Sequence, residues 1–261
     1  MSSLWTENIE MPEFPTLEKD IRTQVLIIGG GMAGVLCAYF LQQAGVDYCL
    51  LEKDRICQGV TGHTTAKITA QHGLIYEKSL QSLGQERAEL FLKANLKAVE
   101  NYKNLGRFLD CDMEEMDSYL YSVRERRKLE SEMQALSSLG FQADYIEDTE
   151  LPFEVEGAIR FPRQAQFQPL KFAAGISKNL RIYEHSEVRE MTEYFALTEK
   201  GSVAAEKIII ATHFPFINTR GSYYLKLYQN RSYVLACVHG KNLKNNEKQY
   251  QLNKKALGQI C

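Results

Sequence analysis

The sequence has few of the features that mark metal-binding, membrane or secreted proteins. Its six cysteines form no CxxC pair, and its cysteines and histidines are not spaced as zinc ligands. The longest apolar run, near residues 25–28, is far too short to cross a bilayer. The first residues, MSSLWTEN, lack the basic and apolar regions of a signal peptide. We therefore expect no metal site, no membrane span and no secretion signal.

The sequence also lacks the charge of a nucleic-acid-binding protein. Its formal net charge is −2, whereas such proteins carry a strongly basic surface. Basic residues are in clear excess after residue 218, where Glu247 is the single acid, and a solvated tail is favoured there over contact with an anionic surface. Cys37 and Cys49 lie in apolar segments, where a thiol packs as a small hydrophobic group. This use of cysteine fits a reducing cytoplasm.

What the sequence does contain, near its start, is the pattern of a βαβ unit. Residues 24–28, QVLII, are typical of a strand buried on both faces of a parallel sheet. After a glycine-rich turn, residues 32–44 carry apolar residues at helical spacing, and Gly45 ends that helix. Residues 46–52 form a second apolar strand. A strand, turn, helix and strand within about 30 residues is the expected size of one such unit.

The turn carries the GxGxxG pattern of dinucleotide-binding proteins. Gly29 permits a tight turn, Gly31 lets the backbone approach a pyrophosphate, and Gly34 lets helix and strand pack closely. The start of the helix offers N–H groups and a positive dipole end to the phosphates. Glu52, at the end of the second strand, is suited to accept hydrogen bonds from ribose hydroxyls and repels a 2′-phosphate, which disfavours NADP. A glycine-rich turn without a ligand is the less favoured interpretation.

Two later segments favour FAD over NAD. Residues 59–65 are rich in threonine and glycine, as suits a loop that follows the ribityl chain and ring of a flavin. Residues 208–212, IIIAT, form another apolar strand far along the chain, for which an ordinary core strand is the alternative. An NAD-dependent dehydrogenase has no need of either segment and remains a second alternative.

Further helices and strands are expected from periodicity and from glycine and proline positions. The helices are residues 85–109, 124–139 and 169–180. The strands are residues 119–123, 157–167, 181–188, 194–198, 202–205 and 207–211.

Three segments carry a resemblance to a known family: residues 25–53, residues 61–73 (TGHTTAKITAQHG) and residues 208–216 (IIIATHFPF). Together they resemble the FAD-dependent amine and amino-acid oxidoreductases of the D-amino-acid oxidase type, such as glycine and sarcosine oxidases and γ-glutamylputrescine oxidase. The likeness is greatest to a bacterial subgroup that often carries a C-terminal Rieske iron–sulfur domain. It covers roughly residues 4–238, and its second and third segments are the most specific.

The resemblance implies an α/β fold in two interleaved parts. A Rossmann-like FAD-binding domain is interleaved with a smaller substrate domain built on a mixed or antiparallel sheet. The implied boundaries are an extended lead-in at 1–20, an FAD-binding domain at 21–107 and 170–217, a substrate-domain portion at 108–169, and an incomplete return to the substrate domain with a basic tail at 218–261.

The resemblance also implies which residues contact FAD. The pyrophosphate and adenosine contacts fall on Gly29, Gly31, Met32, Ala33, Gly34, Glu52 and Lys53. The flavin follows Thr61, Gly62, Thr64 and Thr65, a strand backbone at Val188 touches the adenine, and Ala211 and Thr212 form a turn that approaches the cofactor again.

No catalytic residue is assigned, because a flavin performs the hydride chemistry itself. His63 and His72 are the histidines expected nearest the flavin, with a hydrogen-bonding loop role favoured over a proton shuttle. Lys67 carries a cation that would stabilise a reduced, anionic flavin, and a helix residue facing solvent or phosphate is the equal alternative.

The sequence departs from the family pattern at its end. Family members return to the first domain with another glycine-rich segment, whereas here residues 240–255 are polar and basic, and neither that segment nor the cysteine and histidine pairs of a Rieske centre follow. We expect FAD-dependent oxidation of a C–N bond in a small amine or amino acid. The alternative is a truncated FAD-binding remnant without independent catalysis. The amine, the electron acceptor and the oligomeric state stay open.

Overall fold

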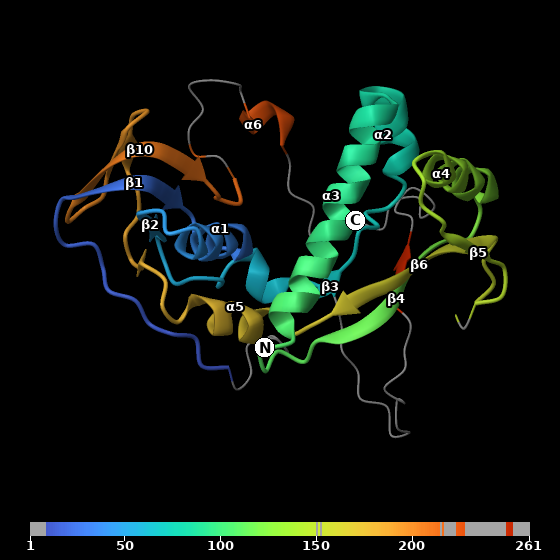
Figure 1. Ribbon diagram of the computed structural model, residues 1–261, viewed down its shortest axis with the longest axis horizontal. Coiled ribbons are helices and arrows are strands. Elements are labelled where there is room, and N and C mark those ends of the chain that lie inside the picture. Colours follow the sequence, from blue (N-terminus) through green and yellow to red (C-terminus); the bar gives the residue numbers. More distant parts are fainter. Residues whose placement is uncertain are drawn as a thin grey trace. The chain divides into compact units, whose positions relative to one another are not determined.

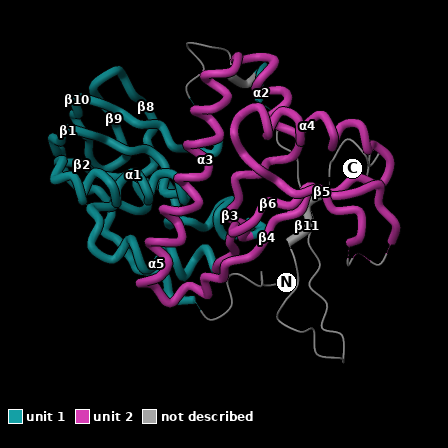
Figure 2. The backbone as a smooth tube through the Cα atoms, turned by 45° about the vertical axis from the view of Figure 1, so that its right-hand side comes forward, with its two compact units in different colours: residues 1–65, 168–238 teal, residues 66–167, 239–261 magenta. Residues whose placement is uncertain are grey.

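The computed structural model describes residues 9–149, 151, 153–214, 216, 223–227 and 249–252. The chain divides into two compact units, residues 1–65 with 168–238 and residues 66–167 with 239–261 (Figure 2). The first unit is therefore assembled from two segments that are separated in sequence by most of the second.

The first unit is built on a six-stranded sheet in the order β7-β2-β1-β10-β9-β8 (Figure 1). The strands are β1 (Ile21–Ile28), β2 (Tyr48–Leu51), β7 (Ile182–Tyr183), β8 (Glu190–Met191), β9 (Phe195–Leu197) and β10 (Ser202–Ile210). β7, β2, β1 and β10 run parallel, and β9 and β8 extend the sheet in antiparallel fashion. The strands expected at 202–205 and 207–211 are one continuous strand, β10.

The most apolar strands lie in the middle of this sheet, where both of their faces are covered. Leu26 and Ile27, neighbours on β1 that point to opposite faces, are both fully buried. The helix α1 (Met32–Gln43) packs against β1 and β2, and α5 (Pro169–Ser177) packs against α1. On one side, Leu26 and Leu51 join a cluster with Leu17 of the lead-in. The strand β1 is therefore buried on both faces of the parallel part of the sheet, as the apolar run at 24–28 predicts.

The second unit is built on a sheet in the order β11-β4-β6-β3, with β5 also paired to β6. The strands are β3 (Lys67–Ile68), β4 (Glu114–Ser122), β5 (Asp144–Ile146), β6 (Gly157–Gln166) and β11 (Gln249–Leu252). The pairs are antiparallel except β11 with β4. The expected α/β class is confirmed, with a mostly parallel sheet in one unit and a mostly antiparallel sheet in the other.

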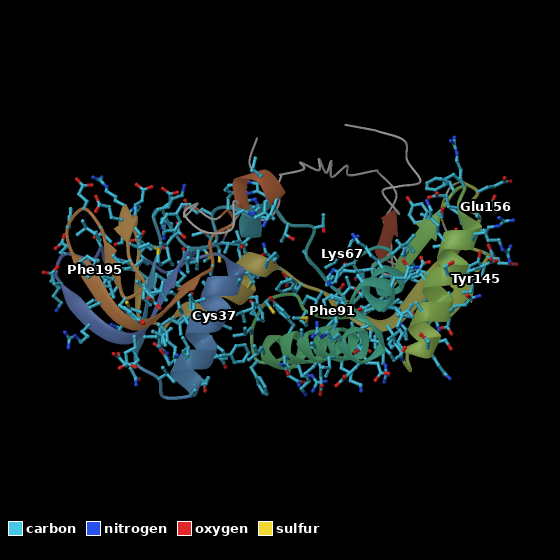
Figure 3. All side chains as sticks on the ribbon, turned by 90° about the horizontal axis from the view of Figure 1, so that it is seen from above. Cys37, Lys67, Phe91, Tyr145, Glu156 and Phe195 are labelled. Atoms are coloured by element: carbon cyan, nitrogen blue, oxygen red, sulfur yellow. The ribbon has the colours of Figure 1, made fainter. Side chains whose placement is uncertain are left out.

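The second unit has three helices in its described residues: α2 (Tyr76–Leu83), α3 (Gln85–Gly106) and α4 (Arg126–Ser138). The helices α3 and α4 pack on the sheet, and α2 packs against both of them. Aromatic rings join α2 to β6 and α3, since Tyr76 stacks on Phe161 of β6 at 6.2 Å between ring centroids and also meets Phe91 of α3 at 6.1 Å. At the far end of β6, the hydroxyl of Tyr145 donates a 2.8 Å hydrogen bond to the carbonyl of Glu156 (Figure 3).

The division into units corrects the boundary expected at residue 107. Residues 66–106 belong to the second unit, because β3 pairs with β6 and α3 packs on the same strand. The return to the first unit at residue 168 lies close to the expected 170.

The expected basic tail is only partly covered by the structure. Of residues 218–261, the structure describes 223–227, which include α6 (Tyr223–Lys226), and 249–252. The remaining residues of that predicted segment lie outside the described residues. Within the described ranges, no helix is long and apolar enough to cross a membrane, and no group of His, Cys, Asp or Glu is arranged to hold a metal ion.

Candidate cofactor-binding site

The glycine-rich turn lies where three parallel strands end. Gly29 follows β1 with a φ of +108°, a conformation that side chains rarely adopt, and its N–H donates to the carbonyl of Leu51 at the end of β2, 2.8 Å away. The N–H of Ala211, just after β10, donates to the carbonyl of Ile28 at 2.8 Å. In open α/β sheets, ligands bind outside the carboxyl ends of the strands, which is where this turn lies.

Gly34 is tightly surrounded by backbone, whereas the space next to Gly31 is open. A Cβ at Gly34 would overlap the carbonyl oxygen of Gly29, so this glycine allows the first turn of α1 to lie on the end of β1. A Cβ at Gly31 would meet only the Thr61 hydroxyl oxygen, 3.7 Å away. Gly31 is the N-cap of α1, without a side-chain cap bond or an acidic residue in the first turn. The open backbone at Gly31 and the positive helix end suit an anionic group.

Gly30, within the motif, has a role that the pattern did not predict. Its N–H donates a 2.6 Å hydrogen bond to Oε2 of Glu52. A Cβ there would lie 2.8 Å from Cγ2 of Ile56 and 3.0 Å from Cβ of Glu52. The turn therefore fits directly against the segment that follows β2. No periodicity or spacing signals this contact, because any residue is allowed at that motif position.

Glu52 is held by the backbone on both carboxylate oxygens. Besides the Gly30 bond, Oε1 accepts the N–H of Asp54 at 3.0 Å. The side chain is half-buried, and each carboxylate oxygen can accept more than one hydrogen bond, which leaves capacity for a ribose hydroxyl. The neighbouring Lys53 is exposed and forms a 3.6 Å ion pair with Asp54.

The threonine- and glycine-rich loop reaches the start of α1 through one residue. The hydroxyl oxygen of Thr61, in the short 3₁₀ helix η1 (Val60–His63), accepts the N–H of Met32 at 3.1 Å. Gly62 is buried, and Nδ1 of the exposed His63 lies 2.9 Å from the carbonyl of Gly59. Thr61 thus lies at the glycine-rich turn, which we propose as the pyrophosphate turn, and the half-buried Thr64 and the exposed Thr65 follow it in the sequence.

The segment after β10 returns to the turn, as its sequence predicts. The carbonyl oxygen of Ala211 would lie 2.8 Å from a Cβ at Gly29, and its own Cβ 3.5 Å from one at Gly34. The Thr212 hydroxyl donates to the carbonyl of Phe214 at 3.0 Å. Ala33, on the first turn of α1, is exposed.

Three further predicted site residues lie outside the glycine-rich turn and the segments just described. Val188 is not in a strand, since β7 ends at Tyr183, and it packs half-buried against the core of the first unit. Lys67 lies on strand β3 of the second unit and not on a helix (Figure 3); burial lowers the pKa of its ammonium group. His72 is an exposed residue of the same unit.

Cys57 lies next to the glycine-rich turn, but its thiol is a poor nucleophile. Its N–H donates to the carbonyl of Gly30 at 2.9 Å, and its backbone adopts a φ of +59°. Burial, with the nearby Glu52 carboxylate, raises the pKa of the Cys57 thiol to about 12. A thiol that stays protonated is a poor nucleophile, so Cys57 serves packing and turn geometry.

Comparison with known proteins identifies the family to which this turn belongs. The family model for FAD dependent oxidoreductases matches residues 24–256. The chain belongs to this family. Its cofactor is FAD, and the open backbone at Gly31, the start of α1 and the oriented Glu52 fit the pyrophosphate and ribose of that dinucleotide.

The chain is similar to curated bacterial proteins about twice its length. The Rieske 2Fe-2S iron-sulfur protein YhfW of Bacillus subtilis is 34% identical over 245 residues, which are 89% of this chain and 48% of that protein. The γ-glutamylputrescine oxidoreductase of Escherichia coli is 25% identical over 76% of this chain and 50% of its own length. The chain thus spans about half of each relative.

Solved structures share the fold. The L-proline dehydrogenase of P. horikoshii has a TM-score of 0.60 at 18% identity, over 76% of this chain and 54% of that one. The glycine oxidase of Geobacillus kaustophilus has a TM-score of 0.53 at 20% identity, over 73% of this chain and 55% of that one. At such identities the likeness concerns the fold alone.

Proposed function

We propose that this protein is an FAD-dependent oxidoreductase that oxidises a C–N bond of a small amine or amino acid. FAD, when bound, supplies the two-electron oxidation. The residues of the chain bind and orient the cofactor: Gly31 and the start of α1 receive the pyrophosphate, and Glu52 receives the adenosine ribose. Ala211 and Thr212 close the other side of the turn.

One observation supports this proposal most directly. Of the three motif glycines, Gly29 and Gly34 are required by neighbouring backbone, whereas the space next to Gly31 is open apart from Thr61. A fold that needed this turn only for packing would have no use for a bare backbone at the positive end of a helix. The opening therefore favours a bound anion at Gly31, and the adjacent, backbone-held Glu52 favours a nucleotide.

The amine substrate is proposed from the names of similar proteins. A γ-glutamylputrescine oxidoreductase, a glycine oxidase and an L-proline dehydrogenase are all named for substrates that carry an amine nitrogen. Because this chain spans about half of the curated relatives, both the substrate class and the turnover of this chain are part of the proposal.

The test is a visible absorption spectrum of the purified chain followed by anaerobic mixing with substrates. We expect bound flavin whose absorption bleaches with small amines and amino acids, such as glycine, sarcosine or L-proline. Matched hydroxy acids, such as glycolate for glycine, should leave the flavin oxidised. If only the hydroxy acids bleach the flavin, the protein oxidises an alcohol and the proposed C–N oxidation is wrong.

The two alternatives from the sequence give different results in the same test. Flavin that binds but is reduced by no amine would support a non-catalytic FAD-binding portion. A colourless protein that binds NAD would support a dehydrogenase, which the family membership does not favour.

A further inference from the structure

We propose that Arg55 and Glu184 are positioning residues for the dinucleotide, through which the N-terminal lead-in sets the shape of the pyrophosphate turn. The inference rests on the proposed function, since it concerns the same cofactor site. Neither residue belongs to the glycine motif or to the segments that resemble the family pattern most specifically. Both belong to the first unit, as does the turn that they are proposed to control.

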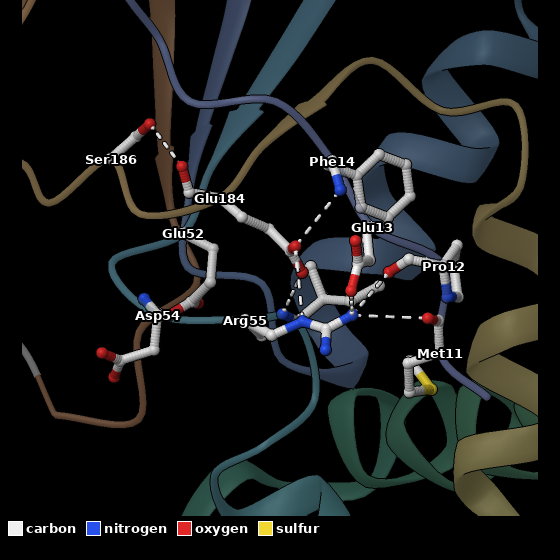
Figure 4. Close-up of polar contacts among 10 residues, drawn as sticks. Met11, Pro12, Glu13, Phe14, Glu52, Asp54, Arg55, Glu184 and Ser186 are labelled. Atoms are coloured by element: carbon white, nitrogen blue, oxygen red, sulfur yellow. Dashed lines mark hydrogen bonds and ion pairs between the residues drawn. The ribbon is translucent and has the colours of Figure 1, made fainter. Parts of the chain in front are cut away.

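Glu184 is a buried carboxylate that joins three segments far apart in sequence (Figure 4). Only 1% of the residue is exposed. Its Oε1 accepts the N–H of Ile56 at 2.8 Å, and its Oε2 accepts the N–H of Phe14 at 3.2 Å. Nε of Arg55 lies 3.7 Å from the same Oε2. A buried charge persists only where such partners compensate for its lost hydration.

Arg55 extends this arrangement to the lead-in. Its Nη2 donates to the carbonyls of Met11 and Pro12, each at 3.3 Å, and lies 3.7 Å from a carboxylate oxygen of Glu13 (Figure 4). The Glu13 side chain is 86% exposed, whereas that of Arg55 is 30% exposed. The guanidinium group therefore interacts mainly with the two backbone carbonyls and with Glu184. Its ion pair with Glu13 is exposed to solvent and contributes little.

The same segment holds the pyrophosphate turn. Ile56, fixed by Glu184, lies where its Cγ2 would be 2.8 Å from a Cβ at Gly30. The next residue, Cys57, binds the carbonyl of Gly30 through its N–H. On the opposite side, the N–H of Ser186 donates to the carbonyl of Glu52 at 2.8 Å. Residues 52–57 are thus fastened on one side to the turn and on the other to residues 184–186.

Glu184 is therefore expected to affect the cofactor-binding residues through the backbone, without contacting the cofactor itself. If the charge of Glu184 is removed, three donors converge on a weaker acceptor, and Ile56 and Cys57 are free to shift. Gly30 and Glu52 follow, because both are bonded to that segment. Small displacements of groups that bind a ligand cost affinity even when every contact residue is intact.

The test compares Glu184→Gln with Asp47→Asn in the full-length chain. Asp47, just before β2, makes an exposed 2.9 Å ion pair with Arg181, just before β7, whereas Glu184 follows β7. The control therefore removes one charge at the other end of the same strand pair. The probes are FAD and ADP, which share the adenosine and pyrophosphate. We expect Glu184→Gln to raise both dissociation constants about tenfold, in parallel, and Asp47→Asn to leave both within twofold.

A second variant and urea unfolding of each apo-protein separate positioning from general stability. Arg55→Lys keeps the charge but loses the fork that reaches two carbonyls, and should raise both constants about threefold. All constants are measured where urea titration shows the apo-protein fully folded. The urea midpoint of each apo-variant is recorded beside its two dissociation constants, so that a change in cofactor affinity is separated from a change in folding stability.

The outcomes distinguish this inference from the proposed function. Dissociation constants for ADP that stay within twofold of wild type in both variants, alongside lower unfolding stability, would make the pair purely structural and overturn the inference. Wild-type chain that binds ADP but no FAD would overturn the flavin proposal, while an ADP loss in Glu184→Gln would still support the positioning role. Binding of neither probe by wild type would overturn both.

Discussion

Three glycines of one motif serve three different purposes at the residue scale. Gly29 has a positive φ and contacts the Ala211 backbone, Gly34 lies on the carbonyl of Gly29, and Gly31 lies beside open space. The motif predicts all three, but only the structure separates those needed by the fold from the one left for the ligand. This difference makes the motif testable residue by residue.

We expect Gly31→Ala to fold normally and to lose cofactor. Gly31 has a φ of −72°, which alanine adopts freely, and the new methyl group meets no backbone. The free energy of unfolding should be unchanged or higher by up to about 1 kcal/mol, whereas FAD affinity should fall at least about tenfold. Urea unfolding of the apo-protein and an FAD titration measure the two effects.

Gly34→Ala is the comparison variant for stability, because the same substitution at this position should destabilise the fold. Its methyl group would overlap the Gly29 carbonyl, so α1 must move and stability should fall by about 2–4 kcal/mol. FAD affinity unaffected by Gly31→Ala would show that the pyrophosphate does not approach this turn.

Glu52 is expected to contribute both to the ligand and to the turn. We predict that Glu52→Ala weakens FAD binding by about 1–3 kcal/mol, because the ribose loses a charged acceptor and the N–H groups of Gly30 and Asp54 lose theirs. Glu206→Ala, on the exposed side of β10, is the control. An FAD dissociation constant within twofold of wild type for Glu52→Ala would contradict the assignment.

The buried thiols predict how stability depends on alkaline pH. Burial raises the pKa of both Cys49 and Cys57 to about 12. As the pH rises above about 9, the unfolded chain releases these protons while the folded chain keeps them, so stability is lost between about pH 9 and pH 12. Each thiol steepens the loss by up to about 1.4 kcal/mol per pH unit.

Cys49→Ala should therefore reduce that slope. Urea unfolding of wild type and variant at several pH values between about 8 and 10 provides the comparison. The variant loses packing at every pH, but its difference from wild type should shrink as the pH rises. A difference that stays constant with pH would show that Cys49 ionises alike in both states.

At the scale of elements, the sequence predicts the helix with the strongest local pattern correctly, but it does not predict which face of that helix is buried. The helix predicted at 32–44 is α1 at Met32–Gln43, but its buried residues are Gly34, Val35 and Ala38, and Phe40 is 49% exposed. Because α1 lies close to β1, its small residues are the ones that face the strand. An analysis of apolar periodicity instead emphasises the large apolar residues of the helix. The pyrophosphate turn was predictable because the motif is local.

Elements and contacts with weak or non-local signals were missed. The helix α2 and the strands β5 and β8 were not predicted, because all three are short. The start of α2 is held by Glu132, more than 50 residues further along the chain, and β8 is a two-residue strand that pairs with the neighbouring β9. The contacts of Glu184 also escape a sequence-based approach, because they join residue 184 to residues 14 and 56. No spacing rule covers such distances.

The start of α2 illustrates a long-range cap. Glu132 of α4 is 1% exposed, and its carboxylate accepts the N–H groups of Ile75, Tyr76 and Glu77, so it replaces the cap that Ile75 cannot provide. We expect Glu132→Ala to lower the free energy of unfolding by about 3 kcal/mol, because buried donors lose their acceptor.

Glu130→Ala tests whether that loss is specific to the cap. Glu130 lies on the same helix and forms an exposed ion pair with Arg126, worth at most about 0.5 kcal/mol. Urea unfolding of both variants decides the comparison, and equal losses would mean that the cap contributes nothing beyond an ordinary helix residue.

At the scale of the whole molecule, the chain leaves the first unit after Thr65 and re-enters it at Gln168. The sequence predicts an interleaved arrangement but places the exit at residue 107, because α3 resembles any amphipathic helix. Only the pairing of β3 with β6 assigns residues 66–106 to the second unit. Assembly of the first unit therefore requires contacts between residues more than 100 positions apart, such as β1 with β10.

The distribution of the fitted residues leads to a last prediction about affinity. The described residues that we propose for FAD binding are proposed for its pyrophosphate and adenosine: Gly31, the start of α1, Glu52 and Thr61. We therefore expect most of the FAD binding energy of this chain to come from the adenosine diphosphate half of the cofactor.

This expectation is tested by comparing FAD, ADP and FMN on the same 261-residue chain. FAD should bind no more than about tenfold more tightly than ADP, a difference of about 1.4 kcal/mol, and FMN should not bind at concentrations that saturate FAD. Isothermal titration of the apo-protein measures all three. FAD binding about a thousandfold tighter than ADP would mean that the flavin ring itself is held strongly, and that residues away from the glycine turn supply most of the affinity.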